Sequence, residues 1–212
     1  MSGIALLRAV NVGGTTLPMA DLRALLEGLG LTRVRTYLQS GNAVFDGRED
    51  EPAQAIATAI EARIERDLGP RVGVLVLPGE SMADVAAANP FLSGSGATAL
   101  APDQGILHAT FLLGSGRDSD FGEASEAAHS AVYEAAFRKL DLPAVEGEEA
   151  AFAGVPPLAV PVVYLKLPHG YGRTTLNNAY FERKLGVAAT TRNWRTVRAL
   201  VEMAGGGSVD GG

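Results

Sequence analysis

The residues best placed to do chemistry lie in a basic stretch near the end of the chain. Residues 166–198 carry seven basic side chains against one carboxylate, a net charge of +6, while the remaining residues carry 11 basic and 23 acidic side chains, a net charge of −12. The basic residues are Lys166, Arg173, Arg183, Lys184, Arg192, Arg195 and Arg198. Such an island attracts anionic ligands, although a solvated helix face has the same composition.

Two glycine-containing loops, residues 8–16 and 169–175, each join a predicted strand to a helix. The first amides of a helix lack partners within the helix, so a phosphate or carboxylate is stabilised there. Neither loop has the sequence of a P-loop or of a dinucleotide fingerprint, and ordinary turns also account for both. The candidate ligand-binding residues in these loops are Arg8, Asn11, Gly13, Gly14, Gly172 and Arg173.

The two helices predicted after the second loop add further candidates. Asn177 and Lys184 lie about 20° apart on a helical wheel and could line a pocket, although a capping Asn and a surface Lys is the favoured interpretation. Arg192 and Asn193 stand at the predicted start of the last helix, where they would face the same cleft as Arg173.

Other catalytic or metal-binding sets are missing from the sequence. The chain has no Cys, which excludes thiol catalysis, and its three His have no metal-ligand spacing. His169 lies in a loop and could act as a general acid or base, although a lone loop His is commonly a surface residue. Residues 39–42 (QSGN) read as a tight turn in which Gln39 and Ser40 are not needed by the turn itself. The sequence names no metal and no cofactor.

Hydrophobic patterning predicts the α+β fold class. The first half has the ferredoxin-like (βαββαβ-type) order, and the second half reads β-α-(β)-β-α-α, which resembles the first in its order of elements and adds a C-terminal helix. The first half shows strands at 3–10, 34–39, 43–45 and 72–77, with helices after residue 18 and at 53–68. The second half shows strands at 106–113 and 162–167, an edge strand within 146–155, helices at 123–140 and 175–185, and a last helix that Thr190 or Thr191 would cap. Trp194 is predicted to anchor that last helix in the core.

The predicted domains are an N-terminal subdomain at 1–90, a connector at 91–105, a C-terminal subdomain at 106–204 and a flexible tail at 205–212. The connector is rich in Gly, Ser, Ala and Pro, and the tail reads GGGSVDGG.

Three segments together resemble one family, the bacterial domain-of-unknown-function family 1697. They are residues 5–14 (ALLRAVNVGG), 35–42 (RTYLQSGN) and 171–194. The family pattern near the start reads ALLRGINVGG, so this chain has Ala9 and Val10 at positions where the pattern has Gly and Ile. The resemblance implies an α+β fold with two ferredoxin-like subdomains, and it implies no activity.

These observations lead to one preferred function and two alternatives. We expect a small phosphate- or carboxylate-bearing ligand in a cleft between the subdomains. A non-enzymatic interaction module that docks an acidic partner or nucleic acid is one alternative, and structural charge pairing in a homodimer is the other. The net charge of −6 makes nucleic acid an unlikely partner. The absence of Cys and of any run of about 20 apolar residues favours a cytoplasmic protein without a membrane span. The sequence does not decide whether the protein is an enzyme, or its oligomeric state.

Overall fold

The computed structural model describes residues 2–11, 16–48, 50–92, 106–113, 126–142, 145–154 and 158–207. Its contacts divide the chain into two compact units, one formed by Met1–Ala83 with Arg198–Gly212 and the other by Asp84–Val197. Each unit is described by itself below. Gly13, Gly14, most of the predicted connector and the end of the predicted tail lie outside the described residues.

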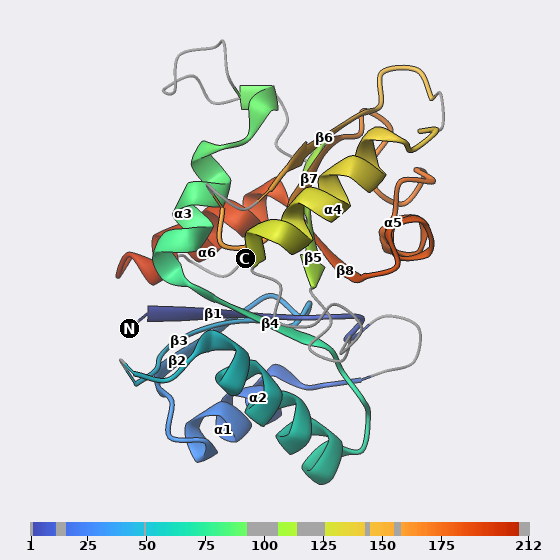
Figure 1. Cartoon of the computed structure of the whole chain (residues 1–212). Helices are drawn as coiled ribbons and strands as arrows, with labels where there is room; N and C mark the ends of the chain where they lie inside the picture. Colours follow the sequence, from blue (N-terminus) through green and yellow to red (C-terminus); the bar gives the residue numbers. More distant parts are fainter. Residues whose placement is uncertain are drawn as a thin grey trace. The chain divides into compact units, whose positions relative to one another are not determined.

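The first unit is a four-stranded sheet with two helices on one face (Figure 1). Its strands have the order β2-β3-β1-β4, and every neighbouring pair is antiparallel. The elements are β1 (Ser2–Leu7), α1 (Met19–Gly28), β2 (Thr32–Tyr37), β3 (Asn42–Asp46), α2 (Ala53–Leu68) and β4 (Val74–Pro78), followed by α3 (Gly79–Ala87), which runs across the boundary between the units.

The core of this unit forms because its helices place apolar residues at helical spacing and its strands place them on alternate positions. Ile56, Ile60 and Ile64 recur every four residues along α2, and all three are buried in one cluster with Leu7 and Phe45 from the sheet. Residues on the opposite face of β1 are buried as well, so this strand is apolar on both faces, as its sequence indicated.

The second unit repeats the same order of elements. They are β5 (Leu107–Leu113), α4 (Glu126–Arg138), β6 (Glu149–Ala153), β7 (Val162–Lys166), α5 (Asn178–Leu185) and β8 (Ala188–Asn193), after a short 3-10 turn (Pro90–Leu92). The strand order β6-β7-β5-β8 is equivalent to that of the first sheet, and all pairs are antiparallel. The predicted α+β class is therefore confirmed. A last helix, α6 (Trp194–Ala204), follows β8.

Strand β8 was missed by the sequence analysis, which placed Thr190 and Thr191 at the start of the last helix. Both threonines lie in β8, where Thr190 pairs with Phe111 and Thr191 with Thr110 of β5. Thr is β-branched and suits a strand, but the side-chain oxygen that also makes Thr a helix cap gave the opposite prediction. The helix begins at Trp194, which is fully buried as predicted.

The end of β1 carries an unusual backbone. Ala9 and Asn11 have φ angles of 55° and 56°. The left-handed region suits Asn better than Ala, because Asn bonds locally while the Cβ of Ala crowds the next carbonyl. Ala9 is also the position at which the family pattern described above has Gly, so the backbone conformation alone explains a Gly there.

We predict that Ala9→Gly raises the free energy of unfolding by about 0.5–1 kcal/mol. Relief of left-handed strain contributes about 1–2 kcal/mol, and the greater freedom of Gly in the unfolded chain offsets about 0.4–1 kcal/mol of it. Urea denaturation measures the change. The matched control is Ala24→Gly at an exposed position in the middle of α1, which should lose about 0.5–1 kcal/mol. Equal losses in both variants would show that Ala9 is not strained.

Candidate functional site

Asn11, a candidate from the first loop, has its side chain committed to the fold. Its Oδ1 accepts a hydrogen bond from the amide of Leu17 at 2.8 Å, and its Nδ2 donates to the carbonyls of Leu17 at 3.0 Å and Gln39 at 2.6 Å. An Asn amide carries two N–H groups, so both are used. The side chain ties the end of β1 to the start of α1 and to the turn after β2, and it has no donor left for a ligand.

The turn at residues 39–42 (QSGN) is also explained by contacts within the fold. The carbonyl of Gly41 accepts from the amide of Leu7 at 2.8 Å. A Cβ on Gly41 would lie 2.4 Å from Val10 Cγ2, and its φ of 68° is itself suited to Gly. The buried Asn42 donates from Nδ2 to the carbonyl of Tyr37 at 3.0 Å and to Ser40 Oγ at 2.8 Å. These contacts join two of the three segments that carry the family resemblance.

Arg8, the remaining described candidate of the first loop, is half-buried. Its backbone amide donates to the carbonyl of Gly73 at 2.8 Å, which extends the pairing of β1 with β4 by one residue. Its role in ligand binding stays a prediction.

In the second unit, a hydrogen-bond network fixes the loop before α5. The Tyr171 hydroxyl accepts from the amide of Asn178 at 3.1 Å and donates to Thr191 Oγ1 at 3.2 Å. Thr191 Oγ1 lies 2.6 Å from Asn178 Oδ1, to which it donates, and 2.8 Å from Thr110 Oγ1. The network therefore joins β5, β8, the loop and the first turn of α5.

His108 lies beneath this network and was missed as a candidate. It is 6% exposed, and its ring stacks on Tyr171 with 5.2 Å between centroids and 30° between planes. Among the described residues, its Nδ1 has no hydrogen-bond partner. Burial lowers the pKa of His108, and the nearby carbonyl of Ile106 opposes that shift. A His inside the apolar run ILHATFLL was the available sequence signal.

The start of α5 does not offer free amides in the way the sequence analysis supposed. The amide of Tyr180 donates to Asn177 Oδ1 at 3.1 Å, so Asn177 is the N-cap of α5. The amide of Asn178 is bonded by Tyr171. Asn193 caps the N-terminus of α6 in the same way, because its Oδ1 accepts a hydrogen bond from the amide of Thr196 at 2.8 Å. The chain's own oxygen atoms thus occupy the positions that an anion would take at these helix starts.

Arg192 of β8 is buried. It pairs with Ala109 of β5, so strand alternation places its side chain on the sheet face opposite to Thr191. Its Nη1 donates to Thr190 Oγ1 at 2.8 Å and to the carbonyl of Thr191 at 3.0 Å. Burial lowers the pKa of Arg192 to about 10, which leaves the guanidinium protonated at neutral pH.

Gly172 and Arg173 are exposed, as is Asn193, whose side chain caps α6. The amide of Arg173 donates to the carbonyl of Gly170 at 3.1 Å, which closes a turn. Within the described ranges, no carboxylate lies within ion-pair distance of the Arg173 side chain. The next residue, Thr174, donates to a carboxylate oxygen of Glu148 at 2.7 Å, so one negative charge stands nearby.

Other basic residues of the stretch 166–198 form an ion pair or a cation–π contact with side chains of the second unit. Lys166 pairs with Glu149 at 2.6 Å, and the guanidinium of Arg183 lies 5.9 Å from the centroid of the Tyr180 ring. Lys184 is exposed at the last turn of α5, as the surface interpretation predicted. The island is therefore neither wholly solvated nor wholly paired.

Metal clusters and membrane-spanning helices are both missing from the described part of the chain. No three His, Asp or Glu side chains there gather closely enough to hold a metal ion. In the same residues, no helix has the length and apolar character needed to cross a membrane.

Comparisons with known proteins give a family and a fold. The sequence model of a family described as "protein of unknown function (DUF1697)" matches residues 1–140. Among solved structures, the chain is similar to the conserved bacterial protein SP0830 from Streptococcus pneumoniae, with a TM-score of 0.64 and 22% identity over 96% of this chain and 98% of that one. No curated protein matches the chain.

We predict that Asn177→Ala lowers the free energy of unfolding by about 1 kcal/mol, because the amide of Tyr180 loses its cap. Asn177→Asp should keep most of the stability, since Asp caps helices as well as Asn does. Denaturation by urea compares the three proteins. Equal losses for Ala and Asp would mean that capping is not the main role of Asn177.

We also predict that His108 makes the protein less stable in mild acid. Because burial lowers its pKa in the folded state below the ordinary value of 6.5, the unfolded chain takes up the proton first as the pH falls. Stability from this group is complete above about pH 6.5 and declines below it. Urea midpoints at about pH 7.5 and about pH 5.5 should therefore differ less in His108→Phe than in the natural protein.

The Phe variant keeps an aromatic ring against Tyr171 and cannot take a proton. His169→Gln, at an exposed loop position, is the control and should leave the pH dependence unchanged. If His108→Phe lost as much stability between the two pH values as the natural protein, titration of His108 would not contribute.

Proposed function

The chain belongs to the DUF1697 family of proteins of unknown function, and we propose that it binds a small phosphate- or carboxylate-bearing ligand at the loop around Arg173. The observation that carries the proposal is the exposed guanidinium of Arg173, at a loop that the Tyr171 network holds in place. A guanidinium forms charge-assisted and often bidentate hydrogen bonds with either anion.

The surroundings of Arg173 leave room for a ligand. A Cβ built on Gly170 or on Gly172 would meet nothing within 4 Å, so the space beside the loop is open. An anion could therefore approach the guanidinium and the backbone together.

The network beneath the loop lowers the cost of binding. Tyr171 is bonded on one side to α5 and on the other to β8, so the loop needs little further ordering when a ligand arrives. Preorganisation of this kind improves affinity without adding a contact. The basic residues of the same unit add a favourable long-range potential, which the carboxylate of Glu148 partly offsets.

The other candidate residues receive different roles in this proposal. Asn177 caps α5 and Asn193 caps α6, and Arg192 donates a hydrogen bond to Thr190 of β8. Arg8, Asn11, Gly13 and Gly14 are left out of the proposed site, which is confined to the unit Asp84–Val197. No catalytic residue is proposed. Docking of an acidic partner, charge pairing in a homodimer and a cytoplasmic location remain predictions from the sequence.

The proposal is tested by titrating the isotope-labelled protein with inorganic phosphate and with phenyl phosphate, at constant ionic strength, and following backbone amide resonances. We expect saturable shifts centred on residues 170–175. Arg173→Ala should weaken binding by about tenfold or more, as expected for the loss of a charge-assisted hydrogen bond.

Lys184→Ala is the matched control, because it removes an exposed cation of the same segment at the far end of α5. It should change the affinity by less than about twofold, which is the scale of a screened surface charge. An unchanged affinity in Arg173→Ala, or equal losses in both variants, would rule out a site at Arg173.

A further inference from the structure

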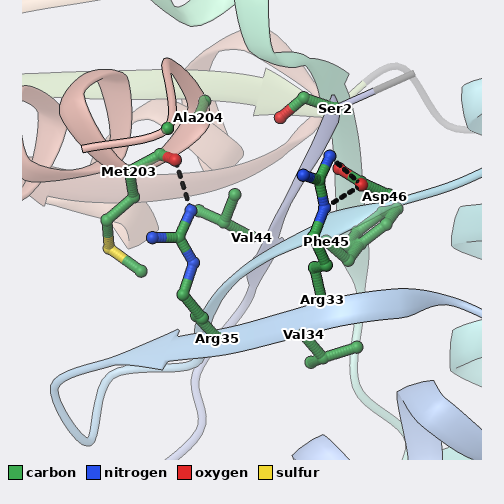
Figure 2. Close-up of a pocket in the computed structure, with 10 residues that line it drawn as sticks. Ser2, Arg33, Val34, Arg35, Val44, Phe45, Asp46, Met203 and Ala204 are labelled. Atoms are coloured by element: carbon green, nitrogen blue, oxygen red, sulfur yellow. Dashed lines mark hydrogen bonds and ion pairs between the residues drawn. The ribbon is translucent and has the colours of Figure 1, made fainter. Parts of the chain in front are cut away.

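A pocket of about 510 Å³ lies in the first unit, between β2, β3 and the C-terminal end of α6 (Figure 2). All of its lining residues belong to the unit formed by Met1–Ala83 and Arg198–Gly212. The volume falls within the range of pockets that bind small molecules. The pocket contains none of the candidate site residues considered so far, so what it binds must be argued from its own lining.

Two arginines of β2, Arg33 and Arg35, face this pocket. Figure 2 shows their side chains on one side of β2 and that of Val34 on the other, as the two-residue alternation of a strand requires. The pairing of β2 with β3 shifts between Thr32 and Arg35, and Arg33 has a φ of 49°.

Arg35 is the fixed member of the pair. Its Nη1 donates to the carbonyl of Gly207 at 2.9 Å and its Nη2 to the carbonyl of Met203, so it satisfies the exposed carbonyls at the end of α6. A guanidinium has more N–H groups than these two bonds use. Arg35 is therefore a rigid donor at the pocket wall, and its charge is balanced in part by the helix end.

Arg33 is the adjustable member. It pairs with Asp46, but its side chain is 81% exposed and that of Asp46 is 25% exposed. An exposed ion pair contributes little to stability, so a ligand can compete with Asp46 for Arg33 at small cost. The pocket thus offers one preorganised guanidinium and one that can be recruited.

The remaining walls are mostly apolar. Val44 and Met203 are buried, Ala204 is half-buried, and the Ser2 hydroxyl adds one polar group. A ligand that fits needs an anionic head for the guanidinium donors and a short apolar body for these walls. A planar carboxylate matches a guanidinium better than a rounded anion does.

We infer that this pocket binds a small monocarboxylate with an apolar body, held by Arg33 and Arg35. This site is separate from the one proposed at Arg173 and does not depend on it. Arg33 exchanges Asp46 for the ligand carboxylate, Arg35 adds a second donor, and Val44 and Met203 contact the apolar body.

The test uses benzoate as the probe, with benzamide as its neutral counterpart and acetate as the head without the body. Amide resonances of the full-length labelled protein are followed during each titration. Benzoate should give saturable shifts at residues 33–35, 44–46 and 203–206, with binding at least tenfold stronger than that of benzamide or acetate. Absence of benzoate binding, equal binding of benzamide, or shifts confined to residues 170–175 would overturn the inference.

Substitutions then separate binding from structural damage. Arg33→Ala should weaken benzoate binding about tenfold, whereas Asp46→Asn should strengthen it because the competing carboxylate is gone. A purely structural effect would weaken benzoate binding in both variants.

Arg35 is not substituted, because it holds the end of α6. Arg71→Ala, at another exposed arginine paired with one carboxylate, is the control and should bind benzoate normally. Normal binding in Arg33→Ala, or weaker binding in Asp46→Asn, would refute the assignment.

Discussion

In the basic stretch at residues 166–198, the position of the loop before α5 depends on one hydroxyl group, that of Thr191. A hydroxyl has a single hydrogen to donate and two lone pairs to accept with. Thr191 gives its hydrogen to Asn178 Oδ1, so it accepts from the Tyr171 hydroxyl, and Thr110 must be the donor in their shared bond. Every hydrogen-bonding position of Thr191 is thereby used, and one side chain of β8 holds the neighbouring strand, the glycine loop and the first turn of α5 in fixed positions.

In the first unit, the side-chain amide of Asn11 has the role that the Thr191 hydroxyl has in the second unit. Asn11 joins β1, the start of α1 and the turn after β2 through three bonds. In both units, then, the polar residues that stand out in the sequence close loops onto the backbone. The resemblance among such segments reports on loop closure and carries no information about a reaction.

Much of the fold could be predicted because it rests on local patterns. The isoleucines of α2 mark a buried stripe, and alternation or continuous apolar runs mark the central strands. Strand β8 was missed because Thr190 and Thr191 suit a strand and a helix cap equally, and only pairing with β5 decides between them. Asn177 posed a similar choice, and its bond to the amide of Tyr180 resolves it in favour of the cap.

The pocket could not be predicted from the sequence, because its walls come from distant parts of the chain. Arg35 and Met203, which meet at its wall, are 168 residues apart in the chain. Two-residue alternation puts Arg33 and Arg35 on one side of β2, but a local pattern does not say which distant segment faces that side.

Net charge does not indicate where this chain could bind an anion, because several of the cations that the structure describes already have partners. Arg192 is buried against Thr190, Lys166 pairs with Glu149, and Arg35 bonds to carbonyls. What matters is how tightly each cation is held by its present partner. A guanidinium bonded to fixed carbonyls keeps them, since releasing it would leave those carbonyls unsatisfied. A guanidinium in solvent, such as Arg173, or one in an exposed ion pair, such as Arg33, can change partners at little cost. An acidic protein can therefore bind anions at a few arginines whose present partners are weak, and its total charge does not determine where.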